Sequence, residues 1–364
     1  MELIDLLRIA AEREASDLHL TVGVPPVLRM NGLLVLLSEM PKLQQEEIAR
    51  LILSSLTDVQ RARFESKWEL DFSTGIPGIA RYRVNVYRQR GSIGAAIRRI
   101  PFDIPPLEDL HLPKAVGELV KKQRGLVLVT GPTGSGKSTT LASMVDVINQ
   151  TRPCHILTIE DPIEYLHKHK RALVNQREVG SDTNSFADAL RSALREDPDV
   201  ILVGEMRDLE TMAIALTAAE TGHLVFATLH TNSAAQSVDR MIDAFPPHQQ
   251  GQIRLQVAQT IEGIVSQRLL PVVDGTARVP AVEIMLANAA IRNMIRDAKT
   301  HQIPTAIQMG ANVGMQTMDT CLRDLYQKGS ISYEEASINV NDLDEFNRYA
   351  RPELSRVPVA GRKP

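Results

Sequence analysis

Short, mostly apolar runs recur between residues 114 and 350, with segments of helical periodicity between them. The four clearest runs are Leu126–Val129, Ile156–Ile159, Val200–Val203 and Leu224–Ala227. A strand whose residues are all apolar needs cover on both faces, which is the usual situation in parallel sheets whose strands are joined by helices. The pattern therefore predicts an α/β domain with a mostly parallel sheet covered by helices.

A glycine-rich motif follows the first of these runs and precedes a helix-compatible segment. The residues expected to hold a nucleotide in it are Gly131, Pro132, Thr133, Gly134, Ser135, Gly136, Lys137, Ser138 and Thr139. The motif fits G-x-x-x-x-G-K-[ST] at every fixed position. Glycine lets backbone N–H groups curl around phosphate oxygens, and the helix start adds positive potential. Lys137 is expected to reach the β- and γ-phosphates and Ser138 to ligate Mg²⁺, so ATP and Mg²⁺ are the predicted cofactors.

Two other interpretations of this motif are weaker. A plain glycine-rich turn before a helix is disfavoured because both the strand and the helix are present where a phosphate loop needs them. A dinucleotide-binding loop would need glycine at position 139 when the motif is read from Gly134, and Thr139 stands there.

Polar residues follow the other apolar runs. Glu160 ends the second run, Glu205 follows the third, and Thr228 and His230 end the fourth. Ligands of open α/β sheets bind beyond the carboxyl ends of strands, so we expect these groups to meet at one site. Glu205 is a candidate for holding Mg²⁺ through water or for orienting the attacking water, and Glu160 is a candidate for the same water. His230 is a candidate sensor of the γ-phosphate, although a solvated carboxylate or a satisfied histidine stays open for each.

The first 99 residues have a different pattern, with two helical segments and strands of alternating polarity. Arg81–Arg88 and Ile93–Arg99 are predicted to form a hairpin. If Arg88 lies beside Ile93, then Arg83 faces Arg98. Two facing arginines repel each other unless solvent or an anion separates them. We hypothesise that the anion is the γ-phosphate in a cleft between domains or subunits; two solvated arginines are the alternative.

Proline marks the expected domain boundaries. Residues 100–113 contain four prolines and are predicted to link an N-terminal domain, 1–99, to an ATPase domain, 114–350. Residues 351–364 are basic, contain three prolines and are predicted to form a mobile tail.

Composition limits partners and location. The net charge of -3 and 4% aromatic residues argue against nucleic acid as a partner. The two cysteines suit a reducing compartment. The N-terminus lacks the pattern of a secretory signal, and no apolar run approaches the roughly 18 residues of a transmembrane segment. We therefore expect a cytoplasmic protein that can still dock on a membrane complex.

Three segments resemble the motifs of the secretion ATPases. Thr158–Tyr165 is similar to their Asp box, Ile201–Asp208 to their Walker B segment, and Gly222–Thr231 to their His box. The likeness extends over nearly the whole chain, including Ser16–Leu20. It implies a PAS-like α+β N-terminal domain followed by a RecA-like P-loop domain, a homohexamer, and ATP hydrolysis with Mg²⁺.

The resemblance also bears on the catalytic residues. It implies that arginines of the N-terminal domain complete the site, and Arg83 and Arg98 occupy the matching positions. Gly204 stands where other P-loop ATPases usually carry an aspartate for Mg²⁺, and the secretion ATPases share this glycine. Whether Glu160 or Glu205 is the base stays open.

Two further segments, Ala290–Asp297 and Gly310–Thr317, resemble the members of this family that retract type IV pili. The resemblance implies the pilus machinery and an inner-membrane platform protein as partners, and peripheral association with the inner face of the membrane. The two cysteines exclude the four-cysteine zinc insert usual in the assembly motors. An accessory retraction paralogue is the main alternative; a nucleic-acid translocase and a nucleotide-dependent switch are weaker ones.

Overall fold

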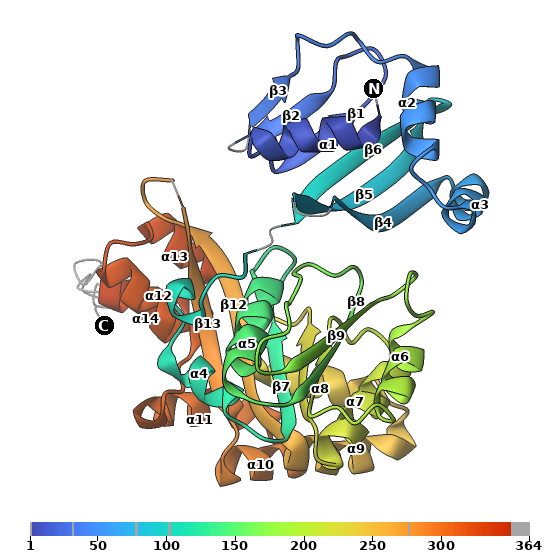
Figure 1. Cartoon of the computed structure of the whole chain (residues 1–364). Helices are drawn as coiled ribbons and strands as arrows, with labels where there is room; N and C mark the ends of the chain where they lie inside the picture. Colours follow the sequence, from blue (N-terminus) through green and yellow to red (C-terminus); the bar gives the residue numbers. More distant parts are fainter. Residues whose placement is uncertain (1, 31–32, 77–78, 101–102, 276, 351–364) are drawn as a thin grey trace. The chain divides into compact units, whose positions relative to one another are not determined.

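The computed structural model describes residues 2–30, 33–76, 79–100, 103–275 and 277–350, and it divides into two compact units (Figure 1). The first unit comprises Met1–Ile104 together with Asp161–Leu166 and Glu178–Asp182, and the second comprises the remainder. These two short segments fall within the sequence range that was predicted to form the ATPase domain, so a single boundary in the proline-rich stretch does not separate the units. The predicted tail, 351–364, lies outside the described residues.

The first unit contains an antiparallel sheet with the strand order β3-β2-β1-β6-β5-β4. Its strands are β1 (Asp17–Leu20), β2 (Val27–Met30), β3 (Leu33–Leu36), β4 (Glu69–Ile76), β5 (Ala80–Gln89) and β6 (Ser92–Ile100). Its helices are α1 (Leu3–Glu12), α2 (Gln45–Leu53) and α3 (Asp58–Lys67).

Alternation of apolar and polar residues builds this sheet. Tyr82, Val84 and Val86 of β5 are buried, while the residues between them are partly exposed. Such buried side chains contribute about 1.5–3 kcal/mol each to folding. The predicted hairpin register is confirmed, because Arg88 pairs with Ile93 and Arg83 with Arg98.

The second unit contains a seven-stranded sheet with the order β13-β12-β7-β11-β10-β8-β9. The strands are β7 (Gly125–Thr130), β8 (His155–Glu160), β9 (Leu173–Glu178), β10 (Val200–Val203), β11 (Leu224–Leu229), β12 (Ile261–Pro271) and β13 (Arg278–Leu286). β12, β7, β11, β10 and β8 are parallel, and β13 is antiparallel to β12. The predicted parallel sheet and its four strands are confirmed.

Helices surround this sheet. They are α4 (Lys114–Val120), α5 (Lys137–Thr151), α6 (Phe186–Ala193), α7 (Leu209–Glu220), α8 (Ala234–Asp243), α9 (Pro247–Thr260), α10 (Ala289–Arg296), α11 (Ile303–Met309), α12 (Met318–Gln327), α13 (Tyr333–Asn339) and α14 (Leu343–Ala350). Three 3₁₀ turns are η1 (Leu107–Leu110), η2 (Thr300–Gln302) and η3 (Ala311–Val313).

Both faces of the parallel sheet are covered. Val127 and Val129 pack with α4 and α5 on the face that Figure 1 shows in front. The alternate residues Leu126 and Leu128 point to the other face and are equally buried. No helix in the described part of the chain is long and apolar enough to cross a membrane.

Candidate nucleotide-binding site

The glycine-rich motif forms the turn between β7 and α5, as the sequence predicts. β7 is buried along its whole length, and α5 begins at Lys137. Gly136 caps the helix with φ of 86°, a left-handed conformation that glycine adopts without strain. No side chain in the described part of the chain caps the α5 N-terminus, whereas Ser233 caps α8 and Asp208 caps α7. The first amides of α5 therefore suit an anionic ligand.

Gln267 of β12 packs against this turn. It was not identified from the sequence. Its buried amide accepts a hydrogen bond from the Thr140 hydroxyl at 2.9 Å. A Cβ at Gly136 would lie 2.8 Å from Gln267 Nε2, and a Cβ at Gly131 would collide with the Gln267 carbonyl oxygen. The glycines thus allow close packing on Gln267 as well as approach of a ligand. The sequence around it, Ser266-Gln267-Arg268, is polar and gives no local signal that Gln267 is buried.

The polar groups of the turn fit a magnesium–nucleotide ligand. Lys137 Nζ donates to the carbonyl oxygens of Gly131 and Pro132 at 2.8 and 3.0 Å. Ser135 Oγ is buried inside the turn and has no hydrogen-bond partner among the described residues. The described residues form no cluster of three or more His, Cys, Asp or Glu that would hold a metal by itself. Mg²⁺ bound through Ser138, phosphate and water needs no such cluster.

The ends of β10 and β11 bring two predicted residues together. His230 Nε2 lies 3.1 Å from Glu205 Oε1, and Arg207 donates to Glu205 Oε2 at 2.7 Å. Burial by itself would raise the pKa of Glu205, but the hydrogen bond and charge of Arg207 and the proximity of His230 lower it overall. Glu205 is therefore an ionised acceptor at neutral pH, which suits contact with water.

Gly204, which precedes Glu205, allows the ends of β8 and β10 to lie close together. Its neighbour across the sheet is the end of β8, and a Cβ at position 204 would lie 3.1 Å from the Ile159 carbonyl oxygen and 3.2 Å from Glu160 Cα. The carbonyl oxygen of Gly204 accepts a hydrogen bond from Thr228 at 2.6 Å, which ties β10 to β11. The aspartate usual in other P-loop ATPases would be crowded at this position.

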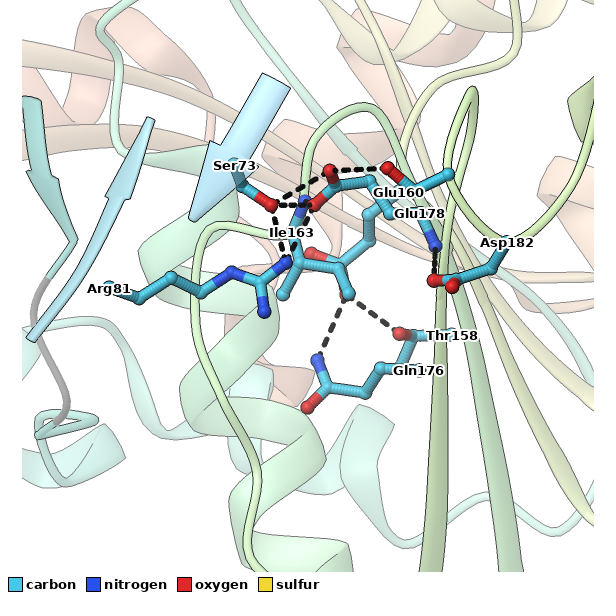
Figure 2. A network of polar contacts seen from close by, with 9 residues as sticks. Ser73, Arg81, Thr158, Glu160, Ile163, Gln176, Glu178 and Asp182 are labelled. Carbon is cyan, nitrogen blue, oxygen red and sulfur yellow. Dashed lines mark hydrogen bonds and ion pairs between the residues drawn. The ribbon is translucent and has the colours of Figure 1, made fainter. Parts of the chain in front are cut away.

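Glu160 is held from its own strand and from β9 (Figure 2). Its Oε1 accepts from the Thr158 hydroxyl at 2.7 Å and from Gln176 Nε2 at 3.2 Å. Glu160 and Glu205 follow neighbouring parallel strands, so the structure places both at the carboxyl edge of the sheet, on the same side as the glycine-rich turn. Gln176 was not identified from the sequence, because β9 itself was not predicted.

Arg83 and Arg98 face each other as predicted, but each also has a carboxylate partner in its own unit. Arg83 binds Asp71 of β4 at 3.1 Å, and the hydrogen bond to Asp71 raises the pKa of Arg83. Arg98 Nε lies 2.9 Å from Asp17 Oδ1. Burial would raise the pKa of Asp17, but the Arg98 and Ser16 contacts prevail and lower it. These carboxylates offset the repulsion between the arginines.

The segment that resembles the retraction motors forms α10. Ile291 and Ile295 are buried in it, while Ala298 is exposed and lies beyond the end of the helix at Arg296. Arg292 donates to Glu262 at 2.7 Å and to the carbonyl oxygens of Ala258 and Gln259. Within Gly310–Thr317, Gln316 bridges to Ile284 of β13, and Thr317 caps α12. Both segments are therefore packed parts of the second unit.

The sequence matches known proteins over most of its length. The family model described as Type II/IV secretion system protein matches residues 109–342. The type IV pilus retraction ATPase PilT of Pseudomonas aeruginosa is 51% identical over 336 residues, which cover 92% of this chain and 97% of that protein. The type IV pilus ATPase PilU of the same organism is 41% identical over 346 residues, covering 95% and 90%.

A solved structure agrees with these matches. The crystal structure of the pilus retraction motor PilT with bound ADP aligns with a TM-score of 0.89 at 51% identity, covering 96% of this chain and 99% of that chain. The expected fold class, a PAS-like α+β N-terminal domain followed by a RecA-like P-loop domain, is confirmed by this likeness. The chain belongs to the Type II/IV secretion system protein family.

Proposed function

We propose that this protein is a mechanochemical ATPase that hydrolyses ATP to ADP and phosphate and powers the retraction of type IV pili. One observation carries the hydrolytic part of the proposal. A phosphate-binding turn and three charged or polar strand ends, Glu160, Glu205 and His230, occupy the same carboxyl edge of one sheet. The likeness to PilT supports the retraction part.

Each residue has a proposed role in attack of water on the γ-phosphate. The Lys137 ammonium and the α5 amides would bind phosphate oxygens, and Ser138 would hold Mg²⁺, which neutralises phosphate charge when bound. Glu205 would orient the attacking water or hold Mg²⁺ through water. Glu160 would contact the same water, and His230 would hydrogen-bond the γ-phosphate.

The arginines have a proposed role of a different kind. Arg83 or Arg98 would neutralise the charge that develops on the γ-phosphate, either in the same chain or in a neighbouring subunit. Their exposure supports this, since 42% of the Arg83 side chain and 71% of the Arg98 side chain are accessible. Closure on ATP would move the arginines from Asp71 and Asp17 onto phosphate, and this exchange would drive domain rotation.

The assembly proposed is a homohexamer in the cytoplasm, bound to an inner-membrane platform protein of the pilus machinery. A primary retraction motor is favoured over an accessory paralogue, because the identity to PilT is 51% and that to PilU is 41%. A nucleic-acid translocase is disfavoured by the net charge of -3. DNA-stimulated, salt-sensitive turnover would favour that function instead.

ATP turnover by the purified chain tests the enzymatic part. Lys137→Ala should abolish steady-state phosphate release. Lys121→Ala is the matched control, because that side chain is exposed and pairs only with Glu118 among the described residues. Turnover that survives in Lys137→Ala would contradict hydrolysis at this turn.

Deletion of the gene tests the cellular part. Cells that lose twitching motility and become hyperpiliated would support retraction. Bald, non-piliated cells would contradict it, because a motor that only retracts is not needed for assembly.

A further inference from the structure

Glu178, the last residue of β9, is a buried carboxylate with an unusually complete set of partners. Its side chain is 3% exposed. Arg81 Nη2 donates to Oε2 at 2.9 Å, and the Ser73 hydroxyl lies 2.8 Å from both oxygens. The backbone N–H of Ile163 donates to Oε2 at 3.2 Å. Figure 2 shows Ser73 and Arg81 directed at this carboxylate.

The partners come from widely separated parts of the sequence but from one compact unit. Ser73 lies on β4 and Arg81 on the neighbouring strand β5, and Arg81 also donates to Ser73. Glu178 and Ile163 belong to the two short segments that the first unit includes, Glu178–Asp182 and Asp161–Leu166. The N-terminal sheet therefore fixes both segments through one carboxylate.

The position of Ile163 gives this contact a consequence for the candidate site. The oxygen that binds Arg81 is also the oxygen that binds the Ile163 N–H. Ile163 is three residues after Glu160, and Gln176, which holds the Glu160 carboxylate, is two residues before Glu178. Glu178 thus anchors both the loop that leaves Glu160 and the strand that orients its side chain.

Loss of the arginine would not leave this arrangement intact. A buried carboxylate that loses its cation must find water or move toward solvent. Either response shifts Asp161–Leu166, because the Ile163 contact depends on the same oxygen. A buried ion pair contributes little to net stability in general, so a role in positioning accounts for it better than a role in folding alone.

We propose that Glu178, bound by Arg81 and Ser73, is a positioning residue for Glu160, through which the N-terminal sheet sets the rate of ATP hydrolysis. The inference rests on the proposed ATPase function. Through Glu178, a change in the N-terminal strands β4 and β5 would change the position of Glu160. This effect would not require any contact of Arg83 or Arg98 with phosphate.

Steady-state kinetics and ADP binding by the full-length chain test this. Arg81→Ala and Glu178→Gln should each lower kcat by about 10- to 100-fold, the size expected when a reacting group is misplaced by about 1 Å. The ADP dissociation constant should stay within about threefold, because the glycine-rich turn is untouched. The double variant should be no slower than the slower single variant, since both remove the same interaction.

Two further variants separate positioning from folding. Arg177→Ala is the control: it removes an ion pair with Glu196 of 2.6 Å, one residue away on the same strand, and should leave kcat within about twofold. Ser73→Ala keeps the ion pair and should lower kcat by a smaller factor than Arg81→Ala.

The outcomes are distinguishable. If the wild type hydrolyses ATP and kcat is unchanged in Arg81→Ala and Glu178→Gln, the inference is overturned, but the proposed function still stands. An equal loss of kcat in Arg177→Ala would also overturn the inference. Absence of turnover in the wild type would instead contradict the proposed function. If Arg81→Ala does not fold, Ser73→Ala decides, and unchanged kcat there would refute the positioning role.

Discussion

His230 Nε2 and Glu205 Oε1 lie 3.1 Å apart, so the ends of two neighbouring parallel strands share a polar contact at the edge of the candidate nucleotide-binding site. This contact and the Arg207 ion pair keep Glu205 ionised, because together they lower its pKa against the effect of burial. A carboxylate that is ionised and oriented can act on water without first losing a proton.

Substitution of Glu205 separates binding from hydrolysis. Glu205→Gln should lower kcat by about 10²- to 10⁴-fold, the usual contribution of a positioned acid–base group. ATP binding should persist, because the amide keeps the volume of the side chain. Parallel measurement of Glu160→Gln would show which carboxylate is the base: the variant with the larger fall in kcat. Equal turnover of both variants and the wild type would exclude both.

The facing arginines give a second prediction. Arg83→Ala or Arg98→Ala should lower kcat by about 10³-fold if that side chain stabilises the γ-phosphate. Asp71→Ala removes the partner of Arg83 but leaves the arginine in place, so it should lower kcat by a smaller factor than Arg83→Ala. Unchanged turnover in both arginine variants would refute their catalytic role.

Gln267 should matter for nucleotide affinity. Gln267→Ala leaves the buried Thr140 hydroxyl without its acceptor, at a cost of about 1–3 kcal/mol. We expect a higher KM for ATP with a smaller change in kcat, since the turn loses support but the strand-end carboxylates do not. Gln249→Ala, an exposed residue of α9, is the control. An unchanged KM in Gln267→Ala would show that the turn holds its shape without this amide.

Burial of His167 predicts acid sensitivity of the fold. Burial lowers the pKa of His167 from 6.5 to about 4, so the folded chain keeps the imidazole neutral. Between these values the unfolded chain binds a proton that the folded chain does not, and stability falls as pH decreases from 6.5 toward 4, by roughly 3 kcal/mol in all. Urea unfolding of the wild type and His167→Gln at pH 7 and pH 5 should show the smaller loss in the variant. His248→Gln, which replaces an exposed histidine, should lose as much stability between pH 7 and pH 5 as the wild type.

Substitution of the two arginines of α10 should change the free energy of unfolding by different amounts. Arg292 donates to Glu262 and two carbonyl oxygens, whereas the exposed Arg296 donates to Asn293 of its own helix. Arg292→Ala should therefore lower the free energy of unfolding by about 1–3 kcal/mol, and Arg296→Ala by less than about 0.5 kcal/mol.

If the exposed face of α10 couples hydrolysis to the pilus, Arg296→Ala should retain ATP turnover and lose twitching motility. Retained motility would show that this coupling depends on residues other than Arg296.

Local patterns were sufficient for the parts of the fold that depend on neighbours in sequence. The tight turn after β5 fixed the pairing of Arg83 with Arg98, because hairpin register follows from turn length. The continuous apolar runs identified the parallel strands, because complete burial leaves no polar alternation. The glycine-rich turn between β7 and α5 was predictable because its glycine spacing, followed directly by Lys137 and Ser138, is typical of a strand–turn–helix motif.

Contacts between distant elements were not predictable in this way. The pairing of Asp17 with Arg98 depends on β1 lying beside β6, which no local pattern specifies. β9 was missed because its residues, Leu173–Glu178, are mostly polar and lie at a sheet edge, where burial imposes little pattern. Glu178, whose role depends on that strand, was missed with it.

The inclusion of Asp161–Leu166 and Glu178–Asp182 in the first unit affects how the protein can be divided. A fragment that begins at Pro105 would carry the Glu178 carboxylate without Arg81 or Ser73. A chimaera made with the N-terminal half of a relative would have to exchange three stretches of chain, or match the relative at these contacts. Modular recombination at the proline-rich stretch alone is therefore expected to yield hybrids that fold but turn over slowly.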